Sequence, residues 1–161
     1  MEKITIFLRP YNAGEETKEI VTGVLQKLGI SADFSYQADG KPVLSSGYVS
    51  VSHSADAIAI AVSDFPVGID FERIREVNYR SVLARLGEAD CGLTDFFALW
   101  TRAESVFKVE GGSISTYKTS KLHTLTYVWS EYVLSVSSTE TGISVDFLID
   151  GALSPKIELL R

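Results

Sequence analysis

Between residues 49 and 71 the chain reads VSVSHSADAIAIAVSDFPVGIDF. Two apolar runs, at 49–52 and 57–62, are separated by a short polar segment, and a third run, at 67–71, follows Pro66. Short apolar runs bounded by turn-forming residues are typical of β-strands. We therefore predict a β-hairpin followed by a third short strand.

The segments on either side of this region show helical and extended patterns. Residues 15–28 and 94–109 place apolar side chains three or four positions apart, and a glycine follows each segment closely. This spacing predicts two helices. In the second helix, Thr94 is the predicted N-cap and Asp95 suits the first turn. We further predict a short helix at 78–86, strands at 3–8, 122–129, 132–138 and 143–149, and a turn-rich segment at 31–46.

This order of elements predicts an α+β fold in which helices pack on mostly antiparallel sheet. An apolar helix followed by antiparallel strands occurs twice, although no residue-level repeat links the two parts. The chain has 161 residues, of which 45% are hydrophobic, and this length fits one domain or two small halves that share an interface. We predict an N-terminal half at residues 1–65 and a C-terminal half at residues 66–161.

Charge, cysteine content and hydropathy narrow the class of protein. The chain carries 15 Lys+Arg against 21 Asp+Glu, a net charge of −6, whereas proteins that bind nucleic acids present a basic face. A single cysteine, Cys91, leaves no internal disulfide framework. No stretch approaches the roughly 20 apolar residues of a membrane span. We expect a cytoplasmic protein that binds neither nucleic acid nor membrane.

The strand predicted at 67–71 contains one acidic residue, and a second acidic residue follows it directly. Residues two apart on a strand point the same way, so Asp70 and Glu72 share a face. Two such carboxylates repel one another unless a cation or a proton lies between them, and magnesium takes one or two carboxylates together with substrate phosphates. Two solvated acids at a strand end would give the same pattern.

The helix at 94–109 carries a second charged pair. Glu104 and Lys108 are four residues apart and lie on one face. An exposed ion pair of this kind is common on helices, but Trp100 and Phe107 indicate that much of this helix is buried. Glu104 is therefore a candidate third carboxylate for a metal, and Lys108 a candidate phosphate ligand.

Two further signals are weak by themselves. Ser52 and His53 lie between apolar runs, where hydroxyl and imidazole groups suit a phosphate, although a solvated or structural histidine is the commoner case. No G-x-S-x-G elbow supports a serine hydrolase. Lys41, in the Gly-Lys-Pro turn at 40–42, presents one cation, but the spaced glycines of a Walker loop are absent.

These motifs occur in a fixed order along the chain: G-K-P at 40–42, V-S-H-S at 51–54, V-G-I-D-F-E at 67–72 and W-T-R-A-E-S-V-F-K at 100–108. In this order the chain resembles the 4′-phosphopantetheinyl transferase superfamily. The resemblance is to the monomeric, two-half (surfactin-synthetase-activating) type, which modifies peptide and polyketide synthases. It covers residues 40–112, and the strand at 132–138 is also similar.

The resemblance implies two similar α+β halves related by a pseudo-two-fold axis, with coenzyme A in the cleft between them. The implied reaction is the magnesium-dependent transfer of 4′-phosphopantetheine from coenzyme A to a serine of an acyl or peptidyl carrier protein. It implies the following roles: magnesium ligands Asp70, Glu72 and Glu104; catalytic residues Glu104 and Lys108; coenzyme A contacts Lys41, Ser52, His53 and Lys108.

The chain departs from the pattern of this family at two places. Ala103 stands where the family usually has a lysine, and the first helix carries only Lys18 and Lys27 in place of its usual arginines. A degenerate relative that binds coenzyme A or a carrier protein without turnover is therefore the main alternative. A phosphate-ester hydrolase that uses the same carboxylates and His53 is a third hypothesis.

Overall fold

The computed structural model describes residues 2–54, 56–129, 131–150 and 157–160. Its first sheet has the strand order β4-β5-β1-β9. The members are β1 (Lys3–Pro10), β4 (Tyr48–Ser54), β5 (Ala57–Ser63) and β9 (Ser144–Ile149). β1 pairs antiparallel with β5 and parallel with β9, which returns from the other end of the chain.

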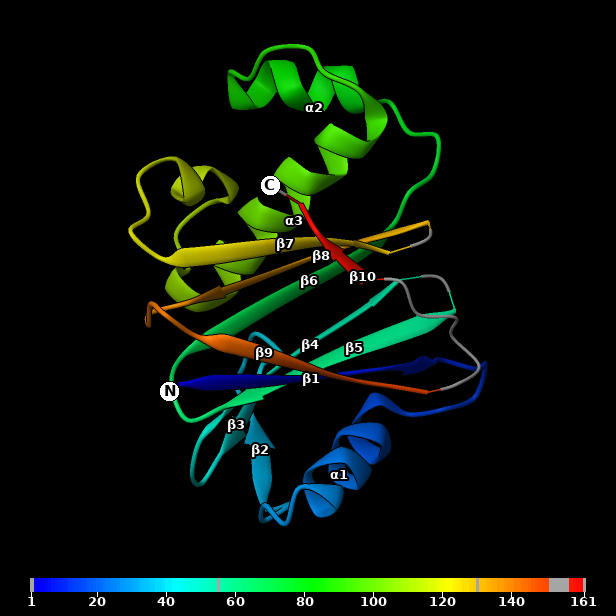
Figure 1. Ribbon diagram of the computed structural model, residues 1–161, viewed down its shortest axis with the longest axis vertical. Helices are drawn as coiled ribbons and strands as arrows, with labels where there is room; N and C mark the ends of the chain where they lie inside the picture. The colour runs from blue at the N-terminus through cyan, green and yellow to red at the C-terminus, as the bar shows by residue number, and fades with distance from the viewer. Residues whose placement is uncertain (1, 55, 130, 151–156, 161) are drawn as a thin grey trace.

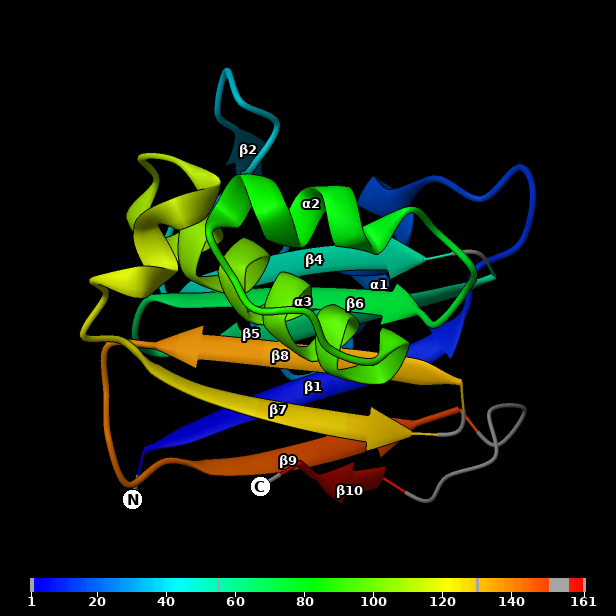
Figure 2. The ribbon, with the colours of Figure 1, turned by 90° about the horizontal axis from the view of Figure 1, so that it is seen from above.

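The second sheet is antiparallel and has the order β10-β7-β8-β6. Its members are β6 (Val67–Arg73), β7 (His123–Trp129), β8 (Tyr132–Ser138) and β10 (Ile157–Leu159). A separate two-stranded hairpin consists of β2 (Phe34–Tyr36) and β3 (Pro42–Leu44). This hairpin projects from the body of the molecule in Figure 2.

Helices cover the outer faces of the two sheets. They are α1 (Thr17–Lys27), α2 (Tyr79–Leu86), α3 (Leu93–Glu110) and the short 3₁₀ helix η1 (Ile114–Lys118). In Figure 1 the layers follow one another as α1, first sheet, second sheet and α3, with α2 outermost beside α3. Within the described residues, no helix is long and apolar enough to cross a membrane.

The alternating sequence of β5 explains these layers. Ala57, Ala59 and Ala61 face the second sheet, while Ile58 and Ile60 pack against α1. Side chains alternate between the two faces of a strand, so β5 is buried on both sides. Small alanines on the inner face leave room for the larger side chains of the second sheet, including Ile69, Phe71, Leu134 and Val136.

Serine side chains join the two sheets along β4 and β6. Ser50, Ser52 and Ser54 lie two residues apart and therefore face the same way. Their hydroxyl oxygens accept hydrogen bonds from the backbone N–H groups of Ile69, Phe71 and Arg73 at 3.0, 3.0 and 2.8 Å. We call this row of three contacts the serine ladder. It satisfies buried donors of β6, and it fixes β6 relative to β4.

The predicted α+β class is confirmed, and so are the main helices and strands. Three details differ. α3 begins at Leu93 with Gly92 as its N-cap, so the prediction of Thr94 as the cap was wrong. His53 lies within β4 rather than in a turn. The turn-rich segment contains the β2–β3 hairpin, whose strands of three residues are too short to show a period.

Candidate active site

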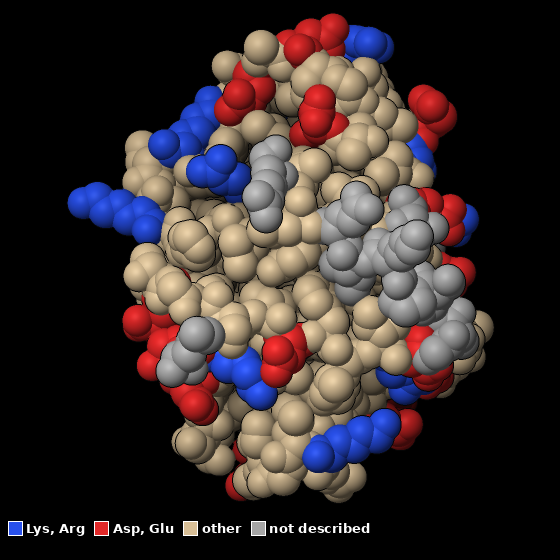
Figure 3. All heavy atoms as spheres, viewed as in Figure 1, with Lys and Arg blue, Asp and Glu red and all other residues tan. Residues whose placement is uncertain are grey.

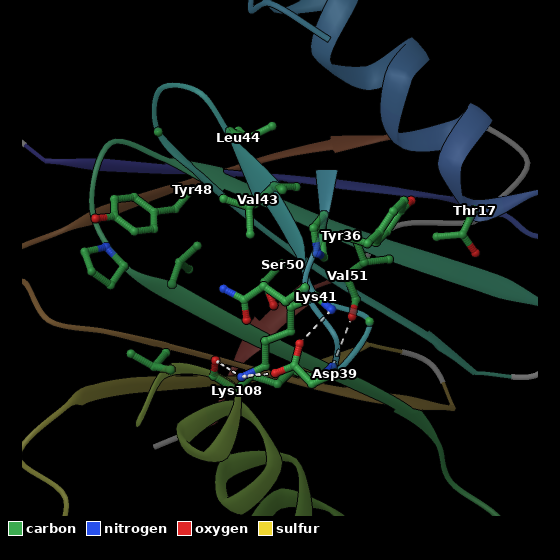
Figure 4. Close-up of a pocket in the computed structure, with 18 of the residues that line it drawn as sticks. Thr17, Tyr36, Asp39, Lys41, Val43, Leu44, Tyr48, Ser50, Val51 and Lys108 are labelled. Carbon is green, nitrogen blue, oxygen red and sulfur yellow. Dashed lines mark hydrogen bonds and ion pairs between the residues drawn. The ribbon is translucent and has the colours of Figure 1, made fainter. Parts of the chain in front are cut away.

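A cavity of about 1160 Å³ lies between the β2–β3 hairpin, β4 and the last turns of α3. Four of the predicted site residues line it: Lys41, His53, Glu104 and Lys108. In Figure 4, Lys41, Asp39 and Lys108 lie together at the side of the cavity next to α3. Pockets for drug-sized ligands occupy roughly 300–1,000 Å³, so this cavity has room for a larger molecule.

Lys108 joins α3 to both sheets. Its Nζ donates to the carbonyl oxygens of Val51 on β4 and Ile69 on β6, at 3.1 and 2.7 Å. The same atom lies 3.7 Å from Oδ1 of Asp70. Burial lowers the pKa of Lys108, and the neighbouring carboxylates of Asp70 and Glu104 oppose this shift. The ammonium group of Lys108 thus interacts with two carbonyl oxygens and two carboxylates, which belong to β4, β6 and α3 itself.

Asp70 is the buried carboxylate of the site, with 6% of its surface exposed. Its Oδ1 accepts a hydrogen bond from Oγ of Ser52 at 3.2 Å. Burial raises the pKa of Asp70 to about 7; Lys108 opposes this shift, and the charges of Glu72 and Glu104 add to it. The three carboxylates therefore lie close enough to repel one another, as the sequence predicted for two of them.

Glu104 and Glu72 complete this group. Burial raises the pKa of Glu104, Lys108 opposes the shift, and Glu72 adds to it. Glu72 is half-buried and accepts a hydrogen bond at 2.9 Å from the guanidinium group of Arg75. The predicted pairing of Glu104 with Lys108 on one face of α3 is consistent with this coupling.

The same three carboxylates are the predicted ligands of a magnesium ion. Among the described residues, no three His, Cys, Asp or Glu side chains are grouped so that they could hold a metal ion. However, Oδ2 of Asp70 is buried without a hydrogen-bond partner. Burying a carboxylate oxygen without a partner costs free energy, and such an oxygen is a suitable ligand for a hard divalent cation. The donor set of Asp70, Glu72 and Glu104 therefore fits magnesium chemically.

Of the remaining predicted residues, Lys41 and His53 line the cavity, whereas Ser52 is buried behind it. Nζ of Lys41 donates to the backbone carbonyl of Lys108 at 2.9 Å, near the end of α3, and lies 5.8 Å from the ring centroid of Phe107. The exposed ring of His53 lies 5.0 Å from the ring of Tyr11. Ser52 is buried in the serine ladder, so its hydroxyl supports β6 and Asp70.

Sequence reasoning missed three contributors to this site. Ser50 and Ser54 flank Ser52 in the serine ladder, and the alternation V-S-V-S-H-S at 49–54 was the available signal. Arg75 lies three residues after Glu72 in the chain and forms an ion pair with it. No pattern marked Arg75, because its contact depends on how the chain turns after β6.

Ala103 is fully buried, with 0% of its surface exposed. It packs in one cluster with Val106 of α3 and Tyr117 of η1. Tyr117 in turn donates a hydrogen bond to Glu88 at 2.6 Å. The position at which the resemblance would place a lysine is therefore an apolar contact with η1, directly before Glu104 in the chain.

Several known proteins of one enzyme class are similar in sequence to part of this chain. The chain is 33% identical over 97 residues to the 4′-phosphopantetheinyl transferase psf-1 of Bacillus pumilus. It is 38% identical over 94 residues to the 4′-phosphopantetheinyl transferase AcpT of Salmonella typhi. A third relative, the 4′-phosphopantetheinyl transferase gsp of Aneurinibacillus migulanus, is 29% identical over 107 residues.

The similarity covers part of each protein. The matched segments make up 51%, 48% and 57% of this chain, and 41%, 49% and 45% of the three relatives. The chain thus matches about half the length of these curated relatives. No protein-family model matches it. Since all three relatives are 4′-phosphopantetheinyl transferases, the resemblance inferred from the motifs is confirmed, and the similarity suggests a transferase.

Proposed function

We propose that the protein transfers 4′-phosphopantetheine from coenzyme A to a serine of an acyl or peptidyl carrier protein, as a magnesium-dependent holo-carrier-protein synthase. One observation carries the proposal: Asp70, Glu72 and Glu104 are coupled to one another and to Lys108, beside a cavity of about 1160 Å³. Coupled carboxylates beside a lysine suit a reaction at a phosphate group. The relatives named as 4′-phosphopantetheinyl transferases support the same class.

The proposed reaction is a displacement at phosphorus. The serine oxygen of the carrier forms a bond to the β-phosphorus of coenzyme A, and the bond from that phosphorus to the bridging oxygen breaks. The leaving group, 3′,5′-ADP, takes the electron pair. Magnesium, held by Asp70, Glu72 and Glu104, would neutralise charge on the pyrophosphate. Such transfers depend on positioning and electrostatics more than on covalent catalysis.

Two residues of α3 have the proposed catalytic roles. Glu104 lines the cavity and accepts the serine proton, directly or through water. Its pKa is raised by burial, which makes its carboxylate a better base than an exposed one. Lys108, which also lines the cavity, balances negative charge on the phosphate through its ammonium group.

The residues proposed to contact coenzyme A, which donates the phosphopantetheine arm, lie along β4 and the β2–β3 hairpin. Lys41 and His53 line the cavity and would hold the nucleotide end of coenzyme A. Nζ of Lys41 donates to the backbone carbonyl of Lys108 at 2.9 Å and lies 3.8 Å from Oδ2 of Asp39, and a phosphate of coenzyme A would bind this ammonium group in competition with them. Ser52 would act from behind this surface by fixing Asp70.

The finer predictions on architecture are also proposals. We propose an N-terminal half at 1–65 and a C-terminal half at 66–161, related by a pseudo-two-fold axis. A four-stranded sheet with a covering helix in each half supports this division, although β9 of the second half completes the first sheet. We propose a cytoplasmic monomer, because a cleft between two halves needs no second copy.

The acceptor is proposed to be acidic at the surface that it presents. The net charge of this chain is −6, so long-range attraction to an acidic carrier protein requires a local basic surface. On the face shown in Figure 3, basic side chains gather along the left edge, beside the segment between α3 and β7 of Figure 1. This surface is the proposed approach for the carrier.

Intact-mass spectrometry of an apo carrier protein tests the proposal. The carrier is incubated with this protein, coenzyme A and magnesium. The expected result is a mass gain of one phosphopantetheine arm that requires magnesium and disappears in Glu104→Ala and Asp70→Ala. Full activity in both variants, with the fold retained by circular dichroism, would contradict the assigned roles.

A degenerate relative without turnover is the second candidate function. Ala103 favours it, because the lysine usual in the resembling family is replaced by a buried apolar contact. The exposed Lys18 and the single basic residue of the last turn of α1, Lys27, add little positive charge. Calorimetric binding of coenzyme A without any mass gain across several carrier proteins would support this alternative over the transferase.

A further inference from the structure

Three contacts hold the side chain of Arg75 in place, and one of them is with Glu72. Its Nη1 donates to Oε2 of Glu72 and to the backbone carbonyl of Arg73, both at 2.9 Å. Its guanidinium carbon lies 5.4 Å from the centroid of the Phe97 ring. Phe97 is 2% exposed and belongs to the core around α3, so it is a firm support for the guanidinium group.

This pairing distinguishes Glu72 from the other two carboxylates. Asp70 faces Lys108, and Glu104 is coupled to the same lysine, so one cation serves both. Glu72 alone has a dedicated arginine, and its side chain is only 20% exposed while that of Arg75 is 52% exposed. An arginine at the solvent side can leave without being drawn through the protein core.

We propose that Arg75 is a resident counter-ion of the metal site, which holds Glu72 in the metal-free protein and competes with the divalent cation for it. The inference rests on the proposed function, because it takes Glu72 as a metal ligand. Binding of the cation is then an exchange, in which Glu72 gives up its contact with Arg75.

Arg73 provides a matched control. It is two residues from Arg75 and pairs with Glu131 at 3.1 Å, a carboxylate outside the proposed metal set. Its side chain is 40% exposed. Arg73→Met therefore removes the same unit of charge from nearly the same region without releasing Glu72. Arg75→Met releases Glu72 and replaces the guanidinium group over the Phe97 ring with an apolar side chain.

The experiment measures Mn²⁺ binding by the electron paramagnetic resonance signal of the free ion, without coenzyme A. Mn²⁺ takes the same carboxylate and water ligands as Mg²⁺. Arg75→Met is expected to bind Mn²⁺ about fivefold more tightly than the wild type, a modest gain because half-exposed ion pairs are weak competitors. Arg73→Met is expected to show a smaller gain, and Glu72→Gln with Arg75→Met to lose the gain.

Four outcomes would each overturn the proposal. Arg75→Met could bind Mn²⁺ no more tightly than the wild type, or Arg73→Met could show an equal gain. The gain could also survive Glu72→Gln, or Mn²⁺ binding could be absent from the wild type and every variant. If Arg75→Met does not fold, Arg75→Lys keeps the charge and removes the fork, and an intermediate gain is expected. The carrier-modification assay is separate: no modification, with the gain in Mn²⁺ affinity present, refutes the transferase and not this inference.

Discussion

Nζ of Lys108 lies 3.7 Å from Oδ1 of Asp70, and the same ammonium group donates to the carbonyl oxygens of Val51 and Ile69. One side chain of α3 therefore contacts the first sheet, the second sheet and the buried carboxylate. Asp70 nevertheless keeps one oxygen without a hydrogen-bond partner. Its ionised form is thus incompletely compensated by the side chains and backbone groups around it.

This arrangement predicts a pH-dependent effect of Asp70→Asn on stability. Burial raises the pKa of Asp70 from 3.8 to about 7, so the folded state holds this proton more tightly than the unfolded chain. The contribution of Asp70 to stability is complete below the unfolded pKa and is lost as the pH rises through about 7. Metal-free Asp70→Asn should therefore gain stability over the wild type between about pH 5 and pH 8.

Urea unfolding of both proteins at the two pH values measures this difference. Magnesium should restore the wild type at the higher pH, because a cation binds the ionised carboxylate, and it should have little effect on the Asn variant. A stability difference that does not change with pH would show that Asp70 is ionised or neutral throughout the range.

The serine ladder predicts that a single hydroxyl affects the free energy of unfolding. Ser50→Ala leaves the N–H of Ile69 without its partner inside the protein. An unsatisfied buried donor costs about 1–2 kcal/mol. Denaturant unfolding should show a loss of this size, whereas Ser46→Ala, at an exposed position of the same segment, should be neutral. Equal stability of both variants would mean that water replaces the hydroxyl.

Gly68 is predicted to tolerate no side chain. A Cβ at this position would lie 2.2 Å from the carbonyl oxygen of Ser105, so α3 would have to move away from β6. Overpacking of this kind costs about 3 kcal/mol, and it would also displace Glu104 and Lys108. Gly68→Ala should therefore lose both stability, in thermal unfolding, and magnesium-dependent carrier modification.

Gly23 of α1 is the matched control for that variant. A Cβ there meets nothing within 4 Å. Alanine favours the helix over glycine by about 1 kcal/mol, so Gly23→Ala should raise the melting temperature slightly and leave activity unchanged. A stable Gly68→Ala protein with full activity would mean that the contact between α3 and β6 can relax without consequence.

Ala103→Lys is predicted to destabilise the protein rather than to improve it. The side chain at 103 is fully buried against Tyr117, and a buried ammonium group without a partner costs on the order of 3 kcal/mol. Arg102→Lys, at the exposed neighbouring position, should be nearly neutral. Thermal unfolding compares the two, and a rise in coenzyme A binding by a stable Ala103→Lys protein would contradict this prediction.

Much of the fold could be read from local patterns, because alternation and helical spacing record which face of an element is buried. The short apolar run at 57–62, bounded by turn-forming residues, predicted β5, and the helical spacing in 94–109 predicted α3. The relation between β1 and β9 could not be read in this way. Their parallel pairing joins distant segments, and no turn specifies it.

The candidate site also combines contacts that local sequence spacing predicts with contacts that only the folded chain brings about. Asp70 with Glu72, and Glu104 with Lys108, could be paired because their spacing within one element fixes a common face. That both pairs come together depends on the packing of α3 on β6, which Gly68 permits. The contact of Arg75 with Glu72 depends on how the chain turns after β6, and the burial of Ala103 under η1 depends on tertiary packing, so residue type alone revealed neither.

The parallel pairing of β9 with β1 also sets the order in which the molecule can be completed during synthesis. Until residues 144–149 leave the ribosome, one edge of β1 presents its backbone groups without a partner strand. Unpaired strand edges are templates for wrong association. A nascent chain of this protein therefore carries an open edge on β1 while residues 11–143 are synthesised, and the pairing of β9 with β1 closes that edge.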